Sequence, residues 1–148
     1  AYNRKMALLS ASDEAVLKEH LAAIDTPVSL LLFTQTIGGS GGGPIAKQVL
    51  DELALLNDKI AVVEKNFVLD TEDRTRYGVE HEPAIVVLRD GADTRMRFLG
   101  APTGYEFVPL VEAILLAGTG KAELEDATVA KLDKVTSPVD IKVFSTPT

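Results

Sequence analysis

The chain has 148 residues, and its 15 Lys or Arg against 22 Asp or Glu give a formal net charge of -7 at pH 7. This length fits one domain or slightly more, and 46% hydrophobic with 25% charged residues is the composition of a chain that buries a core. The acidic balance argues against nucleic acid as a partner, because phosphate backbones are bound by basic faces. The absence of cysteine excludes thiol, disulfide, iron–sulfur and Cys-ligated zinc chemistry by this chain alone.

The sequence carries no signal for a membrane. No apolar stretch approaches the roughly 18 residues that span a bilayer, and residues 1–10 lack the basic-then-apolar order of a signal peptide. We therefore expect a cytoplasmic location and no membrane partner. Separately, no cofactor is expected.

The first elements in chain order are a helix and a strand. Ser12, followed by two acidic residues, is predicted to cap a helix that ends before Thr26-Pro27. The apolar residues at helical spacing in this segment are Leu17, Leu21 and Ile24. A continuous apolar run over residues 28–33 then predicts a strand buried on both faces.

A glycine-rich loop follows this strand. Five of the eleven glycines fall within residues 38–43, and Pro44 can take the first position of a second helix, expected to end near Asn57. The predicted apolar stripe of that helix is Ile45, Val49, Leu53 and Leu56. Residues 60–67 are strand-like at their start.

The middle of the chain predicts a short helix and a hairpin. Thr71 is expected to cap the helix and Gly78 to stop it. Asp90-Gly91 is a hairpin signal between two predicted strands, 84–88 and 94–99. These two strands must be antiparallel, whereas the earlier strand-helix-strand unit must be parallel. The predicted fold is therefore α/β, a mixed sheet flanked by helices on both faces, in the element order of the thioredoxin fold.

The last third predicts two helices and a strand. The first of these helices is expected to stop at Gly118, and its apolar residues are Phe107, Leu110, Val111, Ile114 and Leu115. After a small-residue linker, residues 122–135 are expected to form a helix and residues 139–144 a short strand. We therefore divide the chain into units 1–118 and 119–148.

One segment is specific enough to suggest a family. Residues 97–107 read R-F-L-G-A-P-T-G-Y-E-F, with Tyr105 where the family usually has His. Further matching segments are Thr26-Pro27-Val28, residues 47–53, residues 57–60, Tyr77-Gly78-Val79 and Pro83-Ala84. On these segments the chain resembles the N-terminal unit of tandem thioredoxin-fold, glutaredoxin-like protein disulfide oxidoreductases. It is also similar to the N-terminal domain of the flavoprotein component of alkyl hydroperoxide reductases.

The resemblance implies that the redox motif has been lost. It aligns the family's first CxxC with Ser40, Gly41, Gly42 and Gly43, so that both sulfurs are replaced. It also implies that Thr146-Pro147-Thr148 precedes the C-P-x-C of a second unit. Residues 119–148 would then be the first helix and strand of a truncated second thioredoxin-like unit.

On this resemblance we expect a redox-inactive N-terminal scaffold unit of a thiol–disulfide oxidoreductase. The complete protein would be of the protein disulfide oxidoreductase or peroxide-reductase electron-transfer type, with a role in redox homeostasis. No catalytic residue is expected in this chain, which is predicted to be inactive alone. Protein or peptide disulfides would be substrates of the second unit. The alternative is a redox-inactive thioredoxin-like module that binds a protein or peptide.

Glu82 and Pro83 are the other predicted site residues. The resemblance implies that the bond between them is cis and that the backbone edge beside it receives an extended partner. The alternative is an ordinary trans proline opening a strand. The loop before Pro83 is expected to face Gly41–Gly43 across one edge of the sheet.

Other sites have weaker sequence support. The glycine loop precedes a helix N-terminus, where phosphate can bind, but it matches no phosphate-loop motif. Ser40 lacks a base predicted to reach it, which disfavours a serine hydrolase. His81 lies between two glutamates and could ligate a metal, although alternating residues point in different directions. His20 is expected on the surface of the first helix.

The end of the chain carries one further expectation. An apolar strand without its own sheet tends to pair with another chain. We therefore expect either homo-association through Val139 to Phe144 or disorder of that segment.

Overall fold

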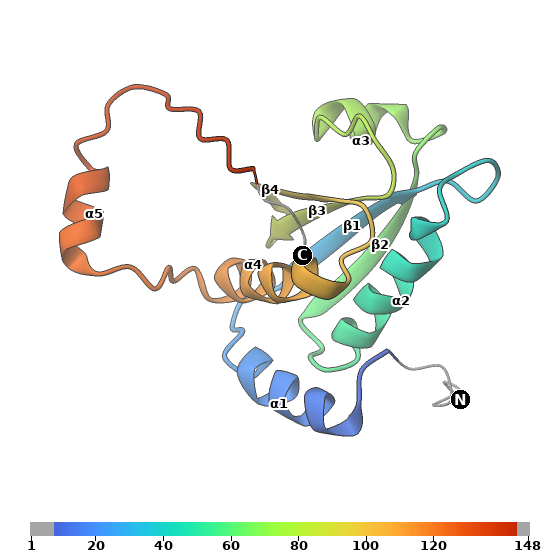
Figure 1. Ribbon diagram of the computed structural model, residues 1–148, viewed down its shortest axis with the longest axis horizontal. Coiled ribbons are helices and arrows are strands. Elements are labelled where there is room, and N and C mark those ends of the chain that lie inside the picture. Colours follow the sequence, from blue (N-terminus) through green and yellow to red (C-terminus); the bar gives the residue numbers. More distant parts are fainter. Residues whose placement is uncertain (1–7, 145–148) are drawn as a thin grey trace.

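The computed structural model describes residues 8–144. It shows a central sheet with helices around it (Figure 1). The elements in chain order are α1 (Ala11–Leu21), β1 (Val28–Thr34), α2 (Gly42–Ala54), β2 (Ile60–Asn66), α3 (Thr71–Arg76), β3 (Ala84–Arg89), β4 (Ala92–Leu99), the 3-10 turn η2 (Gly104–Glu106), α4 (Phe107–Thr119) and α5 (Asp126–Leu132).

The sheet has four strands in the order β2-β1-β3-β4. β1 pairs with β2 in parallel and with β3 antiparallel, and β3 pairs antiparallel with β4. Asp90 and Gly91 take positive φ angles of 47° and 77°, as a tight two-residue hairpin turn requires. The predicted mixed sheet and its hairpin are thus confirmed.

Helices cover the two faces of the sheet unequally. α2 and α4 lie on one face, whereas α3 lies on the other (Figure 1). The larger core is on the α2 and α4 side and takes Leu30 and Leu32 from β1. Leu31 and Phe33 of the same strand belong to a smaller cluster with Tyr77, at the end of α3. Both faces of β1 are therefore buried, as its unbroken apolar sequence predicts.

Two helix N-termini differ from the predictions. α1 is capped by Ser10 and not by Ser12, because the Ser10 hydroxyl accepts a hydrogen bond from the Asp13 backbone N–H at 3.2 Å. α3 has Asp70 at its N-cap position, and Thr71 is already helical. In both segments several polar residues compete for the cap, and the chain path before the helix decides between them.

The ends of α2 and α4 also differ. α2 begins at Gly42, before Pro44, and ends at Ala54. Its buried stripe is rotated, so that Ala46, Val49, Leu50 and Leu53 are buried whereas Ile45 is 44% exposed. α4 continues through Gly118 and ends at Thr119, where Gly120 adopts the left-handed conformation with φ 67°.

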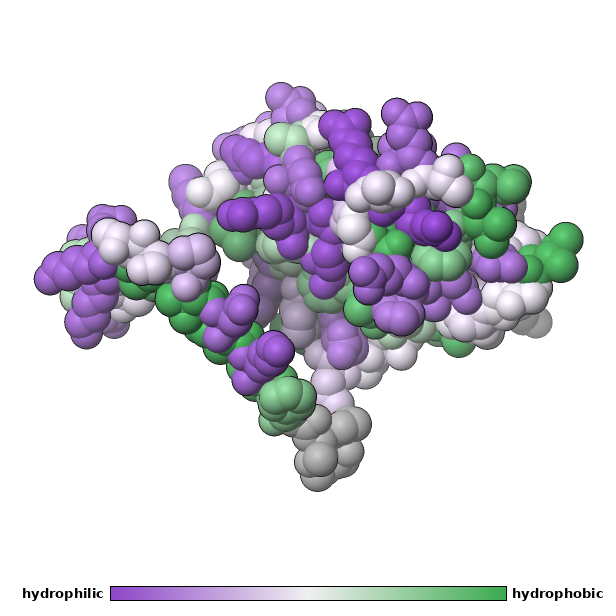
Figure 2. All heavy atoms as spheres, turned by 90° about the horizontal axis from the view of Figure 1, so that it is seen from above, coloured by the Kyte–Doolittle hydropathy of each residue, from purple (hydrophilic) through white to green (hydrophobic). Residues whose placement is uncertain are grey.

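The segment after α4 is the largest departure. Of the helix predicted over residues 122–135, only Asp126–Leu132 is helical, as α5. No strand forms over Val139–Phe144, and all four apolar side chains of that segment are exposed, Ile141 by 82%. The segment pairs with none of the four strands of the sheet, so its backbone groups lack the partners that a strand needs. Figure 2 shows the chain beyond α5 standing away from the body of the molecule.

The helices are too short or too polar to serve as membrane segments. Among residues 8–144, none has the length and apolar character needed to cross a bilayer. Thr146-Pro147-Thr148 lies outside the described residues.

Candidate functional site

The glycine loop, residues 35–43, comprises the connection from β1 to α2 and the first two residues of α2, and it meets the loop that leads into β3. The Glu82–Pro83 peptide bond is cis, in agreement with the resemblance. Gly42 lies opposite Pro83: a Cβ atom on Gly42 would be 3.4 Å from Pro83 Cγ and 3.7 Å from Ala101 Cβ. The expected juxtaposition of the glycine loop with the loop before Pro83 is therefore present, and Gly42 is the residue that faces Pro83.

Close packing explains two of the glycines. A Cβ on Gly43 would overlap the Thr34 hydroxyl, and one on Gly39 would overlap the Gln35 carbonyl oxygen. No side chain fits at either position without movement of β1 or the loop. The glycine content of the loop is therefore set in part by how tightly it turns over the end of β1.

Glu82 joins the two loops by a hydrogen bond. Its Oε1 atom accepts from the Ser40 backbone N–H at 2.6 Å, the short distance of a bond to a charged acceptor. The other oxygen, Oε2, is buried and has no hydrogen-bond partner within the described part of the chain. This bond was not predicted from the sequence. Its only local signal is an acidic residue directly before the proline.

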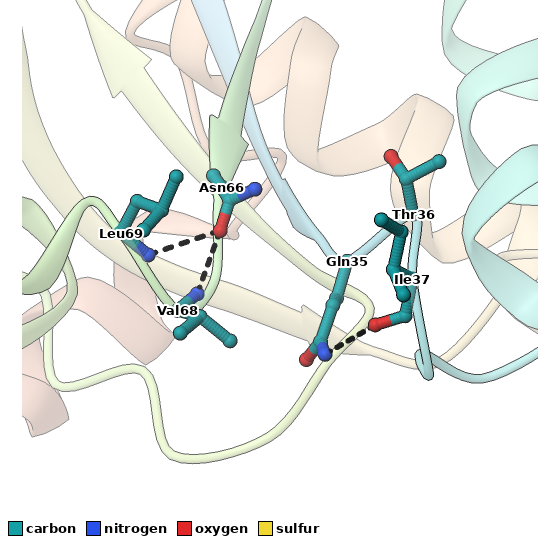
Figure 3. Close-up of a pocket in the computed structure, with 6 residues that line it drawn as sticks. All are labelled: Gln35, Thr36, Ile37, Asn66, Val68 and Leu69. Atoms are coloured by element: carbon teal, nitrogen blue, oxygen red, sulfur yellow. Dashed lines mark hydrogen bonds between the residues drawn. The ribbon is translucent and has the colours of Figure 1, made fainter.

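A pocket of about 240 Å³ lies beside the glycine loop, at the carboxyl ends of the parallel strands β1 and β2 (Figure 3). It is lined by Gln35, Thr36, Ile37, Asn66, Val68 and Leu69. The Asn66 Oδ1 atom accepts from the backbone N–H groups of Val68 and Leu69, each at 2.9 Å. Gln35 Nε2 donates to the Ile37 carbonyl at 2.5 Å. The two amide side chains thus hold the loops on either side of the pocket.

Two apolar side chains of the pocket are unusually open to solvent. Ile37 is 86% exposed and Leu69 is 77% exposed. They belong to the loops that follow β1 and β2. Exposed aliphatic residues around a hollow are typical of a binding surface.

The remaining candidate residues do not assemble a reaction centre. The Ser40 hydroxyl makes no hydrogen bond to the described residues, so no base activates it. His81 is exposed, and residues 8–144 contain no group of three His, Cys, Asp or Glu side chains that could hold a metal. The metal site centred on His81 therefore has no support. His20 is exposed on α1, as expected.

The perturbed pKa values belong to ion pairs outside this site. A hydrogen bond to Asp73, with Lys65 Nζ 2.6 Å from Oδ2, raises the pKa of Lys65. The hydrogen bond from Arg97, with its NH2 atom 2.7 Å from Oδ2, lowers the pKa of Asp93. The first pair joins β2 to α3, whereas the second joins two positions of β4.

Known proteins are similar to this chain over three quarters of its length, although no family model matches it. The chain is 30% identical over 111 residues to an alkyl hydroperoxide reductase component of Xanthomonas campestris pv. phaseoli, and the match covers 75% of this chain and 18% of that protein. The corresponding protein of Escherichia coli is 29% identical over the same number of residues. The chain thus spans about a fifth of the length of the curated relatives it matches.

Two solved structures are similar over most of the chain. The NTD_N/C domain of alkylhydroperoxide reductase from Enterococcus faecalis has a TM-score of 0.74 and 27% identity, over 80% of this chain and 57% of that one. A protein disulfide oxidoreductase from Aeropyrum pernix has a TM-score of 0.72 and 22% identity, over 88% and 58%. The expected resemblance and the thioredoxin fold are thereby confirmed.

Proposed function

We propose that this chain is a redox-inactive thioredoxin-fold scaffold within a thiol–disulfide oxidoreductase whose dithiol lies in another unit. One observation carries the proposal. The loop at the start of α2 faces a cis proline through Gly42, yet no cysteine is present there or anywhere else in the sequence. The surroundings of a redox motif are retained while the reacting atoms are lost. Disulfides would be substrates of the other unit, in the cytoplasm, in the service of redox homeostasis.

The proposal is tested by a turnover assay on the chain alone. Reduction of a protein disulfide such as insulin is followed with dithiothreitol as the reductant. The expected rate equals that of the reagent blank, because thiol–disulfide exchange needs an attacking thiolate. Turnover above the blank, in protein free of contaminating reductase, would overturn the proposal.

The second candidate is a module that binds an extended protein or peptide. The exposed apolar side chains of Ile37 and Leu69 beside the pocket favour it. An unfolded peptide titrated into labelled chain, with amide shifts as the readout, separates the two candidates. A scaffold leaves the amides unshifted, whereas a binding module shifts those around Pro83 and the pocket. Ile37→Ser should abolish such shifts, and Leu55→Ser, at an exposed position on the far end of α2, should not.

A further inference from the structure

The start of α2 lacks an anionic group from its own helix. Its N-cap is Gly41, which has no side chain to accept a hydrogen bond, and its first turn contains no acidic residue. The N-terminus of a helix presents unpaired N–H groups and a partial positive charge, and it favours a negative group nearby. A negative group at this N-terminus has to come from another part of the chain or from solution.

Glu82, in the loop before β3, supplies that negative group. Its carboxylate reaches the Ser40 backbone N–H, one residue before the N-cap, from 42 positions away in the sequence. One of its oxygens is buried without a partner among the described residues, so the carboxylate is held against the loop although only half of it is satisfied. Pro83 fixes the approach, because it packs against Gly42 on the same loop.

We propose that Glu82 is the resident anion of the glycine loop, an autoinhibitory contact that keeps external anions, and any thiolate, from being stabilised at the start of α2. The contact occupies the Ser40 donor and places a negative charge beside the helix N-terminus. A phosphate ion at the loop would have to displace that carboxylate, or its binding would be weakened by repulsion between the two negative charges. The proposal is independent of whether the chain serves as a scaffold or as a binding module.

The first test uses inorganic phosphate as the probe. Amide shifts of residues 38–43 are followed in the parent chain, in E82A, which removes charge and acceptor, and in E82Q, which removes the charge alone. The matched control is E80A, because Glu80 is exposed and two residues away. We expect E82A to bind phosphate at the loop about tenfold more tightly than the parent. E82Q should lie between them, and E80A should match the parent.

Two outcomes would overturn the proposal. Either the parent loop binds phosphate as tightly as E82A does, or E82A and E82Q both leave the loop amides unmoved by phosphate. Amide shifts of β1 and β3 report whether each variant is folded. If E82A is unfolded, the comparison rests on E82Q, which preserves side-chain volume and an acceptor oxygen.

The second test measures the effect of the Glu82 charge on the start of α2 without any ligand. S40C introduces one thiol next to the contact, and its titration is followed by thiolate absorbance. A helix N-terminus normally lowers the pKa of a thiol below about 8.5. With Glu82 present we expect no such lowering, and adding E82Q should lower the pKa of the thiol by about one unit. An unchanged thiol pKa in the double variant S40C/E82Q would refute the proposal, with S40C/E80Q as the control.

Discussion

Glu52, on α2, binds the backbone of Leu8, which precedes α1. The two carboxylate oxygens lie 2.9 Å and 3.1 Å from the Leu8 backbone nitrogen, and Oε2 also accepts from the Leu9 N–H at 3.0 Å. Glu52 is only 5% exposed and is the one buried charged residue in the described part of the chain. The helix that follows the glycine loop is therefore tied to the segment that leads into α1.

Glu52→Gln should loosen that segment. An amide group places N–H donors where the backbone N–H groups of Leu8 and Leu9 need acceptors, so we expect a loss of about 1–3 kcal/mol in the free energy of unfolding. Hydrogen exchange should show reduced protection at both backbone amides. Glu112→Gln, at an exposed position on α4, is the control and should change neither quantity. Unaltered protection at Leu8 in Glu52→Gln would contradict the assigned contact.

Gly118→Ala should destabilise the chain although alanine favours helices. A Cβ at this position would lie 2.7 Å from Ile24 side-chain carbons, and Ile24 is buried. We expect a cost of about 1–3 kcal/mol from overpacking, which outweighs the gain of about 1 kcal/mol in helix propensity. Gly41→Ala is the matched control, because a Cβ there would meet nothing within 4 Å. Urea unfolding measures both, and equal stability of the two variants would refute the prediction.

Asp93→Asn should reduce the free energy of unfolding near neutral pH but not in strong acid. Because the hydrogen bond from Arg97 lowers the pKa of Asp93 in the folded state, the pair contributes above the unfolded pKa of about 3.9 and is lost as pH falls through the folded value. Both side chains are partly exposed, so the expected loss near neutral pH is about 0.2–1 kcal/mol. Urea unfolding of parent and variant should differ near neutral pH and converge in strong acid, below the folded pKa. A difference that persists there would exclude this origin.

The segment Val139–Phe144 should mediate self-association. Its apolar side chains Val139, Ile141 and Val143 alternate with Asp140 and Lys142, the pattern of a strand, and its backbone makes no hydrogen bond to the described residues. Light scattering of the parent chain should show a mass that rises with concentration, because β2 and β4 each leave one edge open.

Charge in this segment should prevent the association. Ile141→Lys with Val143→Glu is expected to give a constant monomer mass, since burial of either charge between strands is unfavourable. Leu132→Lys, at an exposed position on α5, is the control and should associate like the parent. A parent chain that stays monomeric at every concentration would rule the mechanism out.

Local sequence signals predicted the elements that depend on local physics. The apolar run of β1 indicates a strand buried on both faces, and Asp90-Gly91 indicates a tight antiparallel hairpin, because backbone sterics act within a few residues. Helix ends were predicted less well. At α4, Gly118 and Gly120 are both local stop signals; the helix passes the first, which lies close against Ile24, and ends before the second, which takes the left-handed conformation.

By itself the sequence determined the α/β class, the order of the strands and helices from α1 to α4, and the absence of thiol chemistry from this chain, because periodicity, turn chemistry and residue identity are properties of short stretches. Only the tertiary structure decided that Glu82 binds the Ser40 N–H and that a pocket opens beside the glycine loop, and it singled out Gly42 within the expected contact of that loop with Pro83. These features join residues some forty positions apart, and their distances follow from how the loops pack on the ends of the strands.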